Sequence, residues 1–233
     1  MRIDDCYPTP PNIIKCEFET LRFFKDNPFG YQELPILSND ANTYYSAYYS
    51  KLKYHALSDF SFESKIDIKV DGKEGFAHIG ALVESKDINN INRTTYYAAI
   101  FVKEGQKLLR KYHFDYEPSG KLHRQPSPVF HLQYAGELTP RLKDMNIDDN
   151  HLDTWLSEPR LCYFPLSLAL LINLILKEFP DDTNFRLIEH PGWRRLVKKN
   201  ENLIIEPFFK GCQAFFSNNN TNKLFINDFY YGN

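Results

Sequence analysis

Three of the seven histidines lie within nineteen positions of one another. They are His113, His123 and His131, and acidic and amide side chains stand beside them. An imidazole exchanges a proton near neutral pH, so neighbouring histidines can serve as a general acid and a general base. This segment therefore predicts a site for proton-transfer chemistry.

The residues around these histidines follow the alternation of β-strands. His113 and Asp115 share a face if residues 107–116 form a strand, because alternate side chains point to the same side. By the same rule, His131 and Gln133 share a face of a strand over residues 129–134. If the two strands pair, all four side chains converge on one surface. We therefore predict His113, Asp115 and His131 as catalytic residues.

The proline-rich stretch between these two strands adds groups that could hold a substrate. It contains His123 and Arg124, and a guanidinium matches the geometry of a phosphate. We predict Arg124, His123 and Gln133 as substrate-binding residues. The alternative is structural, because one face of an antiparallel sheet is normally wet and a histidine opposite an aspartate is a common pair.

The common metal and nucleotide motifs are missing from the sequence. It has no closely spaced cysteine pair, no phosphate-binding glycine loop, no Gly-x-Ser-x-Gly and no His-Glu-x-x-His. We predict no cofactor and no metal ligand, and a divalent cation stays open as an alternative. Asp67 or Asp71 with Glu84-Ser85-Lys86 would suit a metal-dependent nuclease. That pattern is weak evidence, because acids and lysines alternate along several solvated strands.

Periodicity places a sheet between two groups of helices. Expected strands cover 60–70, 76–84, 95–103, 107–116 and 129–134, with turns at Asp71-Gly72 and Glu104-Gly105. Expected helices cover 13–25, 42–56, 151–156, 165–179, 191–199 and 203–216. We predict one α+β domain over residues 1–233, an antiparallel β-meander of about five strands flanked by N-terminal and C-terminal helices.

Composition narrows the classes of protein. A chain of 233 residues with 42% hydrophobic and 15% aromatic residues is neither disordered nor collagen-like. The net charge of −2 gives no global attraction to nucleic acid or an anionic membrane. A local basic group, Arg194-Arg195 with Lys198-Lys199 beside Trp193, could hold a phosphate backbone, but the pattern favours a solvated helix face.

Compartment follows from the apolar segments and the cysteines. The longest apolar run, residues 166–176, is too short to cross a bilayer, so we expect a buried helix and no membrane partner. The acidic start of the chain is unlike a secretory signal. The four cysteines are far apart, which is typical of reduced thiols and predicts a cytoplasmic protein.

Several of these residues resemble the pattern of an uncharacterised bacterial family. The matching stretches are His-Phe-Asp-Tyr-Glu-Pro at 113–118, Pro-Val-Phe-His-Leu-Gln-Tyr-Ala-Gly at 128–136, and Glu-Pro-Arg-Leu at 158–161. Residues 193–197 and 200–201 are similar to its C-terminal portion, so the resemblance covers about the last half of the chain. It implies an association with antiphage-defence or toxin–antitoxin loci, and it transfers no catalytic residue.

Two functions from different classes follow, and whether the chain is an enzyme stays open between them. The first is a nuclease-like defence or toxin enzyme that acts on nucleic-acid phosphates through His113 and His131. The second is a non-catalytic subunit that binds a protein partner from the same locus. Its basis is the 15 Tyr and 19 Phe, more rings than one core readily buries.

Overall fold

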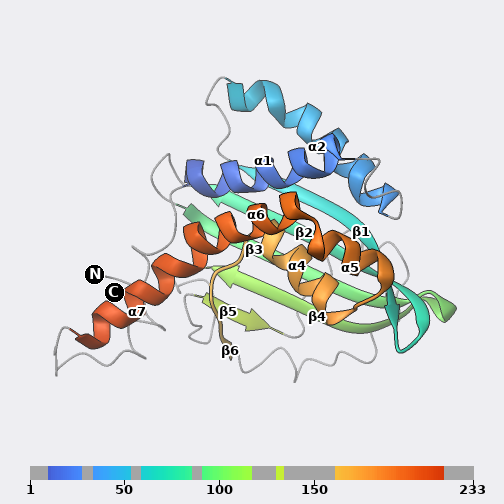
Figure 1. Cartoon of the computed structure of the whole chain (residues 1–233). Helices are drawn as coiled ribbons and strands as arrows, with labels where there is room; N and C mark the ends of the chain where they lie inside the picture. The colour runs from blue at the N-terminus through green and yellow to red at the C-terminus, as the bar shows by residue number, and fades with distance from the viewer. Residues whose placement is uncertain are drawn as a thin grey trace.

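The computed structural model describes residues 10–27, 34–53, 59–85, 91–116, 130–133 and 161–217. Their strands form one antiparallel sheet in sequence order (Figure 1). The strands are β1 (Phe60–Val70), β2 (Lys73–Ser85), β3 (Ile91–Val102), β4 (Lys107–Tyr116), β5 (Phe130–Gln133) and β6 (Leu161–Cys162). This confirms the predicted α+β class and the five-stranded meander, to which the two-residue β6 adds an edge.

The helices come from both ends of the described chain and lie against one face of the sheet (Figure 1). They are α1 (Pro10–Asp26), α2 (Pro35–Lys53), α4 (Leu168–Glu178), α5 (Asp182–Glu189), α6 (Pro191–Asn200) and α7 (Glu206–Ser217). A 3₁₀ turn, η3 (Glu104–Gln106), joins β3 to β4, and a π-helical turn, η5 (Glu201–Ile205), joins α6 to α7.

Side-chain contacts identify the covered face, which we call the helix face. Tyr44 of α2 packs edge-on against Phe62 of β1, with ring centroids 5.1 Å apart. Phe208 of α7 packs against Phe130 of β5 at 5.4 Å. A single hydrophobic core joins these helices to the sheet, and it includes the fully buried Trp193.

The opposite face, which we call the outer face, is not uniformly wet. Its central positions form a second buried apolar cluster: Phe76, Tyr97, Ala99, Phe101 and Leu108. In β1, by contrast, burial alternates strictly, as expected for a strand with one wet face. The centre of the sheet is therefore buried on both faces, whereas the edge strand β1 is buried on one face only.

A β-bulge decides which face of the sheet each β4 side chain occupies. Phe101 pairs with Leu108, but Ile100 pairs with Arg110, so Leu109 is the extra residue. Beyond this bulge Tyr97 pairs with His113 and Thr95 with Asp115, so both β4 side chains share the outer face with β3 side chains.

The helices differ from the predictions mainly at their ends. α2 begins seven residues before the expected position 42, because the buried Leu37 and Ala41 extend the stripe of Tyr44 and Tyr48 back by two turns. α4 begins at Leu168, not at 165, because the Ser167 side chain accepts from the Leu170 N–H and caps the helix.

Two further differences concern the C-terminal helices. α5 was not predicted; it begins after Asp181, whose carboxylate accepts from the Asn184 N–H at 2.8 Å. The two predicted helices over 191–199 and 203–216 are joined by the π turn η5 into one rod. The predicted helix over 151–156 lies outside the described residues.

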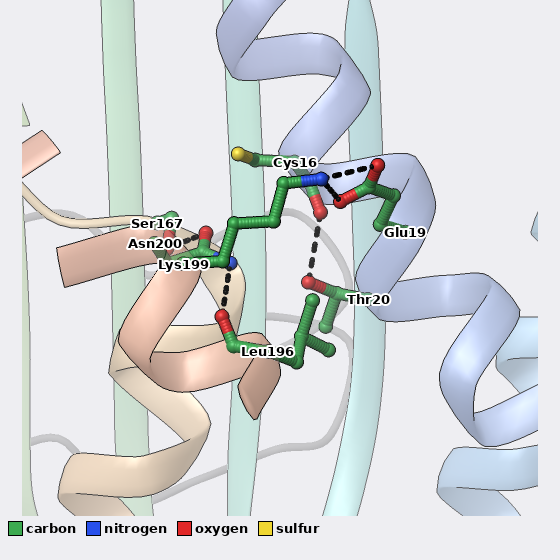
Figure 2. A network of polar contacts seen from close by, with 7 residues as sticks. All are labelled: Cys16, Glu19, Thr20, Ser167, Leu196, Lys199 and Asn200. Carbon is green, nitrogen blue, oxygen red and sulfur yellow. Dashed lines mark hydrogen bonds and ion pairs between the residues drawn. The ribbon is translucent and has the colours of Figure 1, made fainter. Parts of the chain in front are cut away.

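Polar contacts hold α1, α4 and α6 together beside the core (Figure 2). Lys199 of α6 donates to both carboxylate oxygens of Glu19, at 2.7 and 2.6 Å. The Ser167 hydroxyl donates to the buried Asn200 side chain at 2.7 Å. These bonds connect α6 to α1 and to the start of α4. No helix in the described part of the chain is both long and apolar enough to cross a membrane.

Candidate functional site

The pairing of β4 with β5 brings together the residues that the sequence singled out. His113 lies directly opposite Gln133, and Asp115 lies directly opposite His131. Directly paired residues of an antiparallel ladder point to the same side, so all four occupy the outer face. The predicted convergence of these four positions is therefore present in the fold, while their catalytic role stays a prediction.

Asp115 is the centre of a chain of polar contacts on this face. One of its carboxylate oxygens accepts from the Thr95 hydroxyl at 2.6 Å, and the other lies 3.7 Å from Nε2 of His131. Arg93 donates through Nε to the Thr95 hydroxyl at 3.0 Å. Arg93, Thr95 and Asp115 thus connect a cation on β3 to an imidazole on β5.

His131 is itself deeply placed, since only 2% of its surface is exposed. A carboxylate beside an imidazole orients the ring and stabilises the imidazolium that forms during proton transfer. Asp115 lies beside His131 at 3.7 Å, which is longer than a hydrogen bond, and Thr95 holds the carboxylate in place.

His113 is in a different electrostatic environment. The pKa of its imidazole is lowered to about 3, chiefly by burial and in smaller part by the positive charges of Lys111 and Arg93 and by His131. His113 is therefore neutral at physiological pH. Its Nε2 atom is buried and has no hydrogen-bond partner within the described structure, although the residue as a whole is partly exposed.

Tyr97 of β3 supports the ring of His113. The two rings are nearly parallel, with an interplanar angle of 25° and centroids 5.8 Å apart. On its other side, Tyr97 lies across Gly80 of β2, where a Cβ would fall 2.2 Å from the tyrosine ring. The absence of a side chain at Gly80 thus makes room for Tyr97, and Tyr97 in turn limits the positions open to His113.

A third histidine, His78 of β2, lies further along the same face. Its ring is 6.0 Å from that of Tyr97, and only 1% of the residue is exposed. Nε2 lies 3.7 Å from a Glu63 carboxylate oxygen, too far for a hydrogen bond. Neither ring nitrogen has a hydrogen-bond partner within the described structure, which is uncommon for a buried polar group.

The other predicted groups are not part of this arrangement. Arg124 and His123 lie outside the described residues. Asp67 pairs with Phe76 near one end of β2, whereas Glu84 lies at the other end, roughly 26 Å away for eight residues of strand. Asp67 instead binds Lys103 at 3.2 Å. Asp71 lies in the turn beyond Val70, farther still from Glu84, so the metal-dependent nuclease arrangement of Asp67 or Asp71 with Glu84 is wrong.

The basic group on α6 is a solvated helix face. Arg194 pairs with Glu189, and Lys198 pairs with Glu201, both at 3.2 Å. Lys199 pairs with Glu19, as Figure 2 shows. Trp193 is fully buried, so it offers no ring for stacking a base. These ion pairs agree with a solvated helix face, and phosphate binding by this group stays a prediction.

Sequence reasoning missed Arg93, Thr95, Tyr97 and His78 as members of the outer face. Alternation places Arg93, Thr95 and Tyr97 on one side of β3, so their common face was readable from the sequence. Their position relative to His113 depends on the bulge at Leu109, which has no clear signal in the sequence.

The donor set of the outer face suits an anion better than a cation. Among the described residues, no group of three or more His, Cys, Asp and Glu side chains could hold a metal ion. The site instead combines one carboxylate, already bonded to Thr95, with two imidazoles and the nearby charges of Lys111 and Arg93.

Comparisons with protein-family models, with curated proteins and with solved structures gave no match to this chain.

Proposed function

We propose that the protein is a nuclease-like phosphodiesterase of bacterial defence or toxin type, in which His113 and His131 transfer protons. The observation that carries the proposal is the contrast between the two imidazoles. One is neutral and has a buried nitrogen without a hydrogen-bond partner in the described structure, and the other lies 3.7 Å from a carboxylate on the adjacent strand. A base and an acid in such different environments are what general acid–base catalysis requires.

The substrate completes the chemistry at His113. An imidazole with a pKa near 3 is a weak base in the free protein. An anionic phosphodiester beside the ring favours its protonated form and so raises its pKa toward neutrality when the substrate is bound. The guanidinium of Arg93, with N–H groups beyond the one given to Thr95, supplies a phosphate contact at the same face.

The compartment and the resemblance are consistent with this proposal. Cys16 and Cys212 are free thiols, as expected in a reducing cytoplasm. The His-Phe-Asp-Tyr and His-Leu-Gln stretches that resemble the bacterial family contribute His113, Asp115, His131 and Gln133 to the outer face. A defence or toxin role would place the target in the same compartment as the protein.

The test is cleavage of a labelled oligonucleotide that contains both ribose and deoxyribose residues. We expect His113→Ala and His131→Ala each to slow cleavage by about 10²- to 10⁴-fold, the usual contribution of a general acid or base. Added imidazole should restore part of the rate, because it replaces the missing ring and not the fold.

His190→Ala is the matched control. Its Nδ1 accepts from the Gly192 and Trp193 N–H groups at the start of α6, away from the outer face. We expect this variant to cleave at the native rate. Cleavage by His113→Ala and His131→Ala at the native rate, or no cleavage by the native protein, would contradict the proposal.

A second function, a non-catalytic subunit that binds a protein partner, is favoured by the aromatic surface of α7. Phe209 and Phe216 are 56% and 66% exposed and lie two turns apart on this helix. α7 extends past the edge of the sheet in Figure 1. Anchors at this spacing suit insertion into an apolar groove of a protein encoded at the same locus.

Co-purification with the product of the adjacent gene tests this second function. We expect Phe209→Asp with Phe216→Asp to abolish the complex. Phe185→Asp is the control, because Phe185 is equally exposed but lies on α5. A complex that survives the double substitution would contradict this role for α7.

A further inference from the structure

We propose that the phosphodiester cleaved at the outer face belongs to RNA, and that the 2′-hydroxyl of the substrate is the nucleophile. This inference rests on the proposed phosphodiesterase function and adds the substrate class to it. Two observations lead to it: the charges around His113, and the lack of polar partners at its Nε2 atom.

The charges favour a reaction in which protein side chains alone move the protons. Asp115 is the carboxylate of the cluster, and it is committed to the Thr95 hydroxyl and to His131. The charged neighbours that act on His113 are Lys111 and Arg93, both positive. This arrangement attracts a phosphate and leaves no open carboxylate pair to align a water through a divalent cation.

The surroundings of His113 favour a nucleophile that arrives with the substrate. An ordered water needs two to four polar partners to be held in place. Nε2 of His113 is buried beside the flat face of Tyr97 and has no hydrogen-bond partner in the described structure. A ribose 2′-hydroxyl needs no separate binding site, because it is covalently held next to the phosphorus that it attacks.

The proposed step balances as a transesterification. His113 takes the proton from the 2′-hydroxyl while the 2′-oxygen forms a bond to phosphorus. The bond from phosphorus to the 5′-oxygen of the next nucleotide breaks, and His131 gives that oxygen a proton. The products are a 2′,3′-cyclic phosphate and a free 5′-hydroxyl, with no water, oxidant or reductant consumed.

The test uses the native protein and three oligonucleotides of the same sequence. The first is all DNA, the second has one ribonucleotide, and the third has a 2′-O-methyl group at that position. We expect cleavage of the second alone, by at least about 10³-fold over the others, and mass spectrometry should find a 2′,3′-cyclic phosphate at the new end.

The failures of the two proposals differ in this experiment. Cleavage of the all-DNA strand at a similar rate, or an RNA product ending in a 3′-hydroxyl, overturns the RNA inference and leaves the phosphodiesterase function intact. Cleavage of none of the three strands overturns the phosphodiesterase function and the inference with it.

Discussion

Both faces of the sheet bury titratable side chains, but they surround them differently. On the helix face, Glu17 is fully buried, and its two carboxylate oxygens accept from the Tyr96 hydroxyl at 2.6 Å and the Leu168 N–H at 2.9 Å. On the outer face, His78 and His113 have buried ring nitrogens with no hydrogen-bond partner in the described structure.

This difference separates a structural polar group from a candidate functional one. Glu17 ties α1 to β3 and to the first turn of α4 through its two hydrogen bonds. A buried nitrogen without a hydrogen-bond partner costs free energy in folding, so its presence calls for a reason other than stability. We therefore assign stability to the contacts of the helix face and chemistry to those of the outer face.

The sharpest way to break this comparison is to alter Asp115. Asp115→Asn keeps the shape of the side chain but removes the negative charge that lies beside His131 and would stabilise its imidazolium. We expect the rate of oligonucleotide cleavage to fall by about 10²- to 10⁴-fold, with a much smaller effect on the melting temperature. A large loss of stability with an unchanged rate would make Asp115 a structural residue.

The corresponding change on the helix face is Glu17→Ala. It leaves the Tyr96 hydroxyl and the Leu168 N–H buried and unpaired, which we expect to lower the free energy of unfolding by about 2–5 kcal/mol. Urea denaturation measures the loss. Glu17→Gln, which keeps one acceptor oxygen, should lose less. The rate of cleavage by folded Glu17→Gln protein should be native, and a slower rate would contradict the separation of the faces.

The two faces should also respond to pH in opposite directions. Burial raises the pKa of Glu17 from 4.5 to about 8, so the folded chain binds the extra proton and loses stability as the pH rises toward 8. His113 has its pKa lowered from 6.5 to about 3, so the unfolded chain binds the extra proton and stability is lost as the pH falls toward 3.

The two contributions cancel between about pH 4.5 and 6.5, where both are active with opposite sign. Between about pH 6.5 and 8 only Glu17 acts, and between about pH 3 and 4.5 only His113, each changing the unfolding free energy by about 1.4 kcal/mol per pH unit. Denaturant melts across the pH range measure both arms. Glu17→Gln should flatten the alkaline arm and His113→Asn the acid arm, and an unchanged profile in both variants would contradict these assignments.

Gly80→Ala tests the connection between packing and the site on the outer face. The added Cβ would overlap the Tyr97 ring, so the ring must move and can no longer support His113 as it does now. We expect a loss of about 1–3 kcal/mol in the unfolding free energy, together with slower cleavage. The same substitution at Gly75, where a Cβ would overlap the backbone carbonyl oxygen of Phe101, should affect stability without a specific effect on the rate.

The smallest loss of stability is expected for an exposed ion pair between two helices. Lys199→Ala removes the ion pair with Glu19 that Figure 2 shows, and both side chains are partly exposed. Exposed pairs of this kind contribute at most about 1 kcal/mol. A thermal melt that shifted by much more than this would mean that the α1–α6 contact carries more of the fold than its burial indicates.

Much of the fold could be predicted from the sequence because local patterns, the alternation of apolar and polar residues and the turn residues, mark its strands. Alternation in 66–70 and the Asp71-Gly72 turn fix the first hairpin, and Asp71 and Gly72 do adopt the positive φ values that such a turn requires. The two-residue alternation also placed His113 with Asp115, and His131 with Gln133. The helix α5 was missed because a helix of eight residues gives a short periodic signal.

The candidate site was predicted in part only, because its assembly depends on long-range register. The bulge at Leu109 shifts β4 by one residue against β3 and so brings His113 to the face of Tyr97. Without that shift, His113 would pair with Tyr96 instead of Tyr97 and would lie on the helix face. The burial of His78 and the low pKa of His113 arise from neighbours distant in sequence, and local patterns do not contain them.

The most direct test of the outer-face site is nuclear magnetic resonance of the histidine side chains during titration with a deoxyribose dinucleotide. This probe carries a phosphodiester but no 2′-hydroxyl, so it binds without being cleaved in the proposed reaction. The account predicts that the imidazole signals of His113 and His131 shift with increasing dinucleotide, while that of His190 stays in place. Signals of His113 and His131 that stay unchanged up to millimolar dinucleotide would contradict it.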